Sequence, residues 1–193
     1  DQCWETLGRI LPVEETVMPA VYVNSAAVLN AFCGEHGGIT CTSSNATAVM
    51  EWSWARREKI LFFPDEHLGR NTANKMGMPR EEMIVWDPYQ PNGGNTREAI
   101  TRAKLILWKG HCSVHQMFQP VHVDNFRKQY PDGKVIVHPE CHEDVVNKAD
   151  LSGSTELIIR TVTAAPAGTA WAVGTELNLV NRLKRDLTDK KVF

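Results

Sequence analysis

A cysteine and a histidine stand three residues apart in segment 108–115, which reads Trp-Lys-Gly-His-Cys-Ser-Val-His. They follow an apolar run at 105–108 that predicts a buried strand. Parallel α/β proteins build their sites outside the carboxyl ends of such strands. Because a thiolate binds zinc or an iron–sulfur cluster, Cys112 is the candidate metal or cluster ligand, with His115 beside it.

A second candidate pair, His138 and Glu140, follows the apolar run at 135–137. An imidazole and a carboxylate at this spacing serve general acid–base chemistry or metal binding. Taken alone, a structural histidine is the more frequent explanation. With Cys112 and His115, the pair has the ligand chemistry of a zinc site. A single Cys-x-x-His pattern is weak support for zinc, so the identity of the ligand stays open.

Small polar side chains follow other predicted strands and suit the binding of small anions. Tyr22 and Asn24 alternate along one predicted strand, so they share a face; a half-buried strand with a hydrogen-bonded phenol is the plainer interpretation. Ser43 and the pair Ser154 and Thr155 precede segments with helical spacing. Serine and threonine are common helix N-caps, but a helix N-terminus also attracts carboxylates and phosphates.

Composition narrows the classes of protein. The chain has 193 residues, is 42% hydrophobic and 23% charged, and carries a formal charge of -2. This predicts one or two folded domains without a general attraction to nucleic acid or anionic membranes, and no apolar run is long enough to cross a bilayer. Five widely spaced cysteines favour reduced thiols in a cytoplasmic protein. The chain has neither a Gly-x-Ser-x-Gly elbow nor a Gly-rich nucleotide loop, which disfavours serine hydrolases and nucleotide binding.

Apolar runs alternate with segments of helical spacing along the whole chain, which predicts a parallel sheet with helices on both faces. Both ends fall inside predicted elements, and the first residue is not Met, so we expect an internal segment of a longer protein. The predicted strands lie at 20–23, 38–41, 60–63, 105–108, 135–137, 150–151 and 170–173, and the predicted helices include 2–11, 46–57, 97–103, 121–130, 155–164 and 178–187.

The residues at the ends of the predicted strands recur at a nearly constant spacing along the chain. Tyr22 aligns with His138 at an offset of 116, Ser43 with Ser154 at 111, and Phe63 with Val173 at 110. A nearly constant offset indicates duplication of one α/β unit. The alternative is that any parallel α/β chain shows a similar rhythm of strands and helices, but the shared polar residues at the strand ends favour the repeat.

Segment 86–96 is rich in Pro, Gly and Asn, which fix turns and interrupt periodic structure. We expect a surface loop in which Asn95 and Thr96 cap the following helix. A lid over a site is the alternative interpretation.

Seven short motifs lie at the ends of the predicted strands. They are Tyr-Val-Asn-Ser at 22–25, Thr-Ser-Ser-Asn-Ala at 42–46, Pro-Asp-Glu-His-Leu-Gly at 64–69, Gly-His-Cys-Ser-Val-His at 110–115, His-Pro-Glu at 138–140, Gly-Ser-Thr at 153–155 and Gly-Thr-Glu at 174–176. In order and in spacing, these motifs resemble the quinolinate synthase family. The resemblance implies three similar α/β units around a pseudo-threefold axis, each giving one cysteine to a 4Fe-4S cluster. Residues 1–112 and 113–193 then correspond to the second and third units, shortened at the N-terminal and C-terminal ends respectively.

The resemblance also implies an activity. The family is a transferase of NAD biosynthesis that condenses iminoaspartate with dihydroxyacetone phosphate to give quinolinate, with a functional link to L-aspartate oxidase. Cys112 matches one cluster ligand; the other two are expected outside this chain, so the chain alone is expected to be inactive. The catalytic positions match Tyr22, His115, His138 and Glu140, and the substrate-binding positions match Tyr22, Asn24, Ser43, His138, Glu140, Ser154 and Thr155. The competing hypothesis is a metal-independent α/β module that binds a small dicarboxylate or phosphate.

Overall fold

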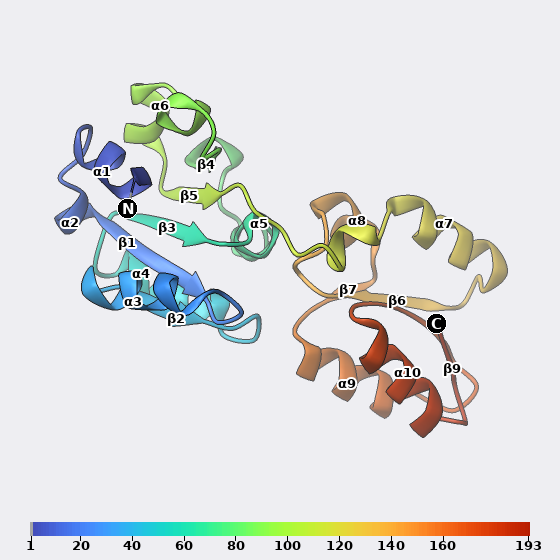
Figure 1. Cartoon of the computed structure of the whole chain (residues 1–193). Helices are drawn as coiled ribbons and strands as arrows, with labels where there is room; N and C mark the ends of the chain where they lie inside the picture. Colours follow the sequence, from blue (N-terminus) through green and yellow to red (C-terminus); the bar gives the residue numbers. More distant parts are fainter. Residues whose placement is uncertain (1) are drawn as a thin grey trace. The chain divides into compact units, whose positions relative to one another are not determined.

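The computed structural model describes residues 2–193 and divides into two compact units, an N-terminal unit up to His111 and a C-terminal unit from Cys112 onward. Each unit has its own sheet of parallel strands with helices around it (Figure 1). The prediction of repeated three-layer α/β/α units with short parallel sheets is therefore confirmed.

The N-terminal unit contains a sheet of five parallel strands in the order β2-β1-β3-β5-β4. Short 3-10 turns at Arg80–Glu82 and Pro91–Gly94 flank its fourth strand. The strands are β1 (Val17–Tyr22), β2 (Ile39–Cys41), β3 (Lys59–Phe63), β4 (Met83–Trp86) and β5 (Leu105–Trp108), and the helices are α1 (Gln2–Gly8), α2 (Val13–Thr16), α3 (Ala27–Glu35), α4 (Ala46–Trp54), α5 (Glu66–Lys75) and α6 (Arg97–Arg102).

Side-chain alternation along the strands builds two hydrophobic layers in this unit. Ile60 and Phe62 of β3 point to the layer that contains residues of α4 and α5. Leu61 and Phe63 point to the opposite layer, which contains residues of α1, α3 and α6. Strands buried on both faces read as continuous apolar runs, which is why β1, β3 and β5 are readily predicted from the sequence.

The C-terminal unit contains four parallel strands in the order β7-β6-β8-β9. One side of this sheet packs on α9 and α10 and the other on α7 and α8 (Figure 1). The strands are β6 (Lys134–Val137), β7 (Leu151–Ser152), β8 (Ala170–Gly174) and β9 (Lys191–Val192), and the helices are α7 (Pro120–Gln129), α8 (Glu143–Lys148), α9 (Thr155–Ala164) and α10 (Leu177–Asp186), with a 3-10 turn at His115–Met117.

Three neighbouring strands are arranged in the same order in the two sheets. In the N-terminal unit β1 pairs with β2 on one side and with β3 on the other. In the C-terminal unit β6 pairs with β7 and with β8 in the same way. In both units the strand in the middle of these three comes first in the sequence, and its two neighbours follow it in the same order. The connections therefore repeat, as the sequence offsets predict.

The strand β4 was not predicted, and several boundaries shift. Trp86 was assigned to the start of the loop, but it ends the strand β4. The helix expected over 2–11 ends at Gly8, and the helix expected over 46–57 ends at Trp54. The four residues of β4 are all apolar, so the sequence does contain a run typical of a strand, but its last residue was grouped with the Pro-, Gly- and Asn-rich segment that follows.

The loop after β4 is held by local contacts. Asn95 donates through Nδ2 to the carbonyl oxygens of Val85 and Gly93 at 2.8 and 2.9 Å, so it fixes the loop instead of capping α6. The cap is Thr96, whose side chain accepts a hydrogen bond from the Ala99 amide at 3.2 Å. Gly93 has a φ of 66°, and a Cβ there would lie 2.4 Å from the Trp86 ring, so this turn requires glycine.

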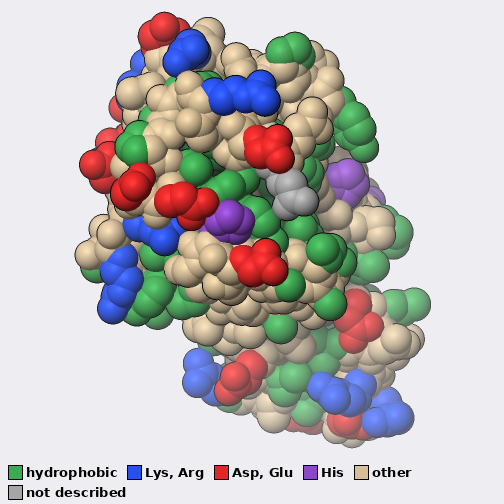
Figure 2. All heavy atoms as spheres, turned by 60° about the vertical axis from the view of Figure 1, so that its left-hand side comes forward, with side chains coloured by type: hydrophobic (Ala, Val, Ile, Leu, Met, Phe, Trp, Pro, Cys, Tyr) green, Lys and Arg blue, Asp and Glu red, His purple; other side chains and the backbone are tan. Residues whose placement is uncertain are grey.

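Charges of both signs are mixed on the face of the molecule shown in Figure 2. None of the helices within residues 2–193 combines the length and the apolar character that crossing a bilayer requires.

Candidate functional site

The carboxyl ends of three neighbouring strands meet at one edge of the C-terminal sheet. Val137, the last residue of β6, pairs with Ser152 of β7 and with Gly174 of β8. The His138 amide donates to the Gly174 carbonyl at 2.9 Å. The residues just beyond these strands, including His138 and Thr175, therefore lie at the edge where parallel sheets bind ligands.

His138, Glu140 and His115 form a buried cluster at this edge. Glu140 Oε2 lies 3.1 Å from His138 Nδ1 and 3.5 Å from His115 Nδ1. The two imidazole rings stack with centroids 4.6 Å apart. The three side chains are only 3–8% exposed. Two imidazoles and a carboxylate shielded from water can hold a proton and pass it between them.

The ring of His115 is neutral in this environment. Burial, the larger cause, and the nearby His138 together lower the pKa of His115 to about 4, against the opposing effect of Glu140. Nε2 lies 3.5 Å from Thr175 Oγ1. Nδ1 lies 3.5 Å from Glu140 Oε2 but has no hydrogen bond among residues 2–193. The proton of the neutral ring is therefore best placed on Nε2, where the threonine oxygen accepts it, which leaves the Nδ1 lone pair directed inside the cluster.

The pair His138 and Glu140 has two hydrogen-bonded forms. The Glu140 amide donates to His138 Nδ1 at 3.3 Å, which requires that nitrogen to be without its proton. When the same nitrogen carries a proton, the carboxylate oxygen at 3.1 Å can accept it. The geometry therefore provides a hydrogen-bond partner for His138 Nδ1 both without and with a proton on that nitrogen.

Cys112 lies beside this cluster on the loop after β5. Its sulfur and one ligand atom each of His115 and Glu140 lie within 4.8 Å of one another. Gly110 sets the start of this loop, because a Cβ at this position would lie 2.2 Å from the Pro64 carbonyl oxygen. Only glycine allows so close an approach of two backbone segments.

The cysteines differ in their suitability as cluster ligands. Cys112 is partly exposed, whereas burial raises the pKa of Cys3, Cys33 and Cys41 to about 12. Cys141 is fully buried, with its sulfur 3.7 Å from the Gly174 carbonyl oxygen. Within residues 2–193 the donor set therefore fits one thiolate corner of an iron–sulfur cluster, at Cys112.

The serine and threonine predicted at β7 begin a helix. Ser154 is the N-cap of α9, and its hydroxyl accepts a hydrogen bond from the Leu157 amide at 3.3 Å. Thr155 is the exposed first residue of that helix. Glu176, the last residue of the motif Gly-Thr-Glu, caps α10 by accepting hydrogen bonds from the Asn178 and Leu179 amides. Glu176 therefore has a structural role that its position after β8 explains.

In the N-terminal unit, Tyr22 and Ser43 lie near the carboxyl ends of the adjacent strands β1 and β2. Tyr22 is the buried last residue of β1 and pairs with Cys41, two residues before the partly buried Ser43. Asn24 is exposed and lies past the end of the strand. The expectation that Tyr22 and Asn24 alternate along one strand is therefore wrong, because β1 ends at Tyr22.

Thr175 contributes to the cluster but was not selected from the sequence. It is 4% exposed and contacts His115 across 60 positions of sequence. The signal that could have found it is its place directly after β8, in the motif Gly-Thr-Glu.

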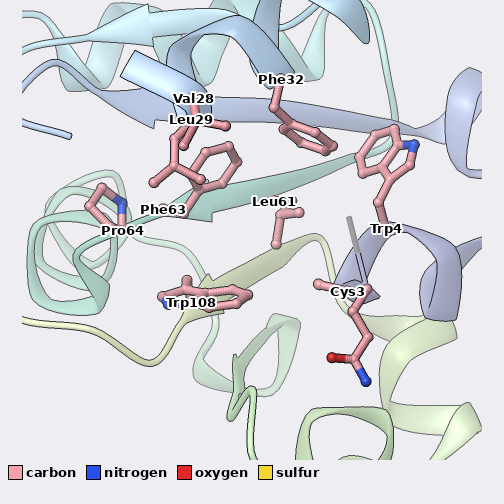
Figure 3. A pocket seen from close by; sticks show the side chains of 10 residues that line it. Cys3, Trp4, Val28, Leu29, Phe32, Leu61, Phe63, Pro64 and Trp108 are labelled. Atoms are coloured by element: carbon pink, nitrogen blue, oxygen red, sulfur yellow. The ribbon is translucent and has the colours of Figure 1, made fainter. Parts of the chain in front are cut away.

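An apolar hollow of about 360 Å³ in the N-terminal unit is separate from the predicted chemistry. Figure 3 shows Trp4, Phe32, Phe63 and Trp108 around it. Cys3 also lines it, but the raised pKa of this thiol keeps it protonated. None of the predicted catalytic residues lines this hollow.

Comparison with known proteins identifies the family. Residues 4–193 match the family model of quinolinate synthetase A protein. The chain is similar to proteins called quinolinate synthase from Rhodopirellula baltica, with 55% identity over 100% of the chain, and from Acidobacterium capsulatum, with 58% identity over 96%. It is 49% identical to the quinolinate synthase of Corynebacterium glutamicum. The chain spans about half the length of these relatives, 49–50%. It belongs to the quinolinate synthetase A family.

Proposed function

We propose that the protein that contains this chain condenses iminoaspartate with dihydroxyacetone phosphate to give quinolinate for NAD biosynthesis. The name of its relatives supports this reaction. The atoms balance with release of phosphate and two waters. The reaction therefore needs groups that form an imine, move protons between carbon and nitrogen, and remove water.

The observation that carries the proposal is the buried cluster of His115, His138 and Glu140 next to Cys112. The His138 and Glu140 pair takes up and returns the protons of tautomerisation and dehydration. The neutral His115 accepts a hydrogen bond from a substrate N–H or O–H at Nδ1, and burial of the three side chains keeps competing water out. We assign Tyr22 a catalytic and substrate-binding role in the N-terminal unit.

The substrates carry carboxylates and a phosphate, which require hydrogen-bond donors. Ser154 and Thr155 lie at the start of α9, where backbone N–H groups and the helix dipole favour anions. We assign them, with Asn24 and Ser43 of the N-terminal unit, to substrate binding. The two units correspond in this proposal to the second and third units of the family.

Cys112 is assigned as one ligand of a 4Fe-4S cluster, and the part of the protein that this chain does not span supplies the other two. When bound, a cluster with three thiolate ligands provides an open iron that polarises a substrate oxygen. Because a single thiolate cannot hold the cluster firmly, we expect residues 1–193 alone to be inactive.

The test is an anaerobic assay of the intact protein after reconstitution with iron and sulfide. We expect quinolinate formation by the intact protein, and none by residues 1–193 alone or by Cys112→Ser. Iron content should fall with activity in Cys112→Ser and stay constant in Cys3→Ser, the matched cysteine control. Quinolinate formation by metal-free protein, or binding of both substrates without any turnover by the intact protein, would contradict the proposal.

A further inference from the structure

His115 Nδ1 is a buried nitrogen without a hydrogen bond among residues 2–193. The side chain is 8% exposed, so bulk water does not serve this atom. A buried polar atom left unpaired costs about 1–3 kcal/mol. Native proteins keep few such atoms, and a bound ion is one of the explanations for them.

Two further electron-pair donors face the same space. Glu140 Oε2 lies 3.5 Å from His115 Nδ1. The Cys112 sulfur lies within 4.8 Å of one ring nitrogen of His115 and of one carboxylate oxygen of Glu140. An imidazole lone pair and a carboxylate oxygen that face each other repel unless a proton or a metal cation lies between them. Three donors of this kind close together suit a metal cation.

The chemistry of the donors selects the cation. A thiolate with an imidazole favours zinc over magnesium or calcium, and zinc is preferred to ferrous iron at most nitrogen and sulfur sites. In zinc sites the ligand atoms lie about 2.0–2.3 Å from the metal. Closing the present set around zinc requires a shift of about 1 Å, which the partly exposed loop residue Cys112 can make.

A second residue positions the imidazole for this role. Thr175 Oγ1 lies 3.5 Å from His115 Nε2 and is itself buried. Holding the proton on Nε2 leaves Nδ1 free to bind a metal. Metal-binding histidines have such a partner on the other ring nitrogen in almost all known sites.

We propose that Cys112, His115 and Glu140 form a mononuclear Zn²⁺ site, which fills when no iron–sulfur cluster is present. The site has three protein ligands and one position for water. A single thiolate cannot serve both metals well, so zinc and the cluster compete for Cys112. This inference does not rest on the catalytic proposal, because zinc binding is measurable whether or not quinolinate forms.

The test uses the intact protein, purified anaerobically and stripped of iron with a chelator and a reductant. Zinc chloride is titrated against a chromophoric chelator, and Co²⁺ replaces zinc as a spectroscopic probe. We expect one tightly bound Zn²⁺ per chain and a thiolate-to-cobalt charge-transfer band that Cys112→Ser removes. His115→Ala and Glu140→Gln should each weaken zinc binding by about tenfold or more, as loss of a ligand must exceed loss of a supporting contact.

The control is His111→Ala, which removes an exposed histidine next to Cys112 and should leave zinc affinity unchanged. Circular dichroism checks the fold of every variant. If His115→Ala does not fold, zinc affinity is measured in the nearly isosteric Glu140→Gln and in His115→Gln instead. Wild-type zinc affinity in folded Glu140→Gln and His115 variants would show that cysteines alone hold the metal and would overturn the proposal, as would the absence of zinc binding.

Discussion

The two units share a strand order but differ in what stands at the strand ends. In the C-terminal unit the central strand β6 leads into His138 and Glu140, both buried. In the N-terminal unit the corresponding strand β1, which pairs with β2 and β3, leads into Val23 and Asn24, both exposed. The common backbone therefore provides an edge for a site, and the residues placed there decide whether that edge holds titratable groups.

After the strands β3 and β8, by contrast, the two units have the same feature, a carboxylate that caps the next helix. Asp65 after β3 and Glu176 after β8 each accept a hydrogen bond at 2.7 Å from an amide in the first turn of the next helix. Carboxylates that cap helices in both units are part of the fold. Those that occur in one unit alone, such as Glu140, are the better candidates for function.

The largest expected contrast between the units is in thiol reactivity. A pKa of about 12 for Cys33 and Cys41, against an ordinary value near 9, reduces the thiolate fraction at pH 8 by about a thousandfold. The partly exposed Cys112 should therefore react with iodoacetamide first in the metal-free protein, as followed by peptide mass spectrometry. Labelling of Cys33 or Cys41 as fast as Cys112 would contradict the contrast.

A smaller effect is expected from Thr175→Val, which removes the oxygen facing His115 Nε2. Zinc affinity of the metal-free protein should fall by up to about tenfold, and the nitrogen NMR shifts of the His115 ring should report a changed tautomer. Thr163→Val, an exposed threonine on α9, is the control and should change neither. Unchanged ring shifts in Thr175→Val would remove this residue as a positioning group.

The smallest effect concerns the feature that the units share. Asp65→Ala and Glu176→Ala should each lower the free energy of unfolding by about 1 kcal/mol, because each removes an N-cap. Urea denaturation followed by circular dichroism measures both losses. A loss in only one of the two variants would show that the caps are not equivalent.

Much of the fold could be predicted because strands buried on both faces have continuous apolar runs. The runs that end at Phe63, Trp108 and Val137 are examples. β4 was not predicted although Met83–Trp86 are all apolar, because Trp86 was grouped with the loop-forming segment 86–96.

The site was predicted in part for similar reasons. His138 and Glu140 are close in sequence, so their spacing alone indicates a pair. The contact of His115 with Thr175 joins distant segments. That His115 Nδ1 has no hydrogen-bond partner within residues 2–193 depends on side-chain geometry. Neither could be inferred from local spacing.

The central claim is that the buried carboxylate after β6 moves protons, whereas the carboxylate after β8 only caps a helix. The most direct test compares the turnover of Glu140→Gln and Glu176→Gln in the reconstituted intact protein, with iron content measured for both. We predict a fall in kcat of about a hundredfold or more for Glu140→Gln at normal iron content, and turnover close to wild type for Glu176→Gln. Wild-type turnover in Glu140→Gln, or equal losses in the two variants, would contradict the account.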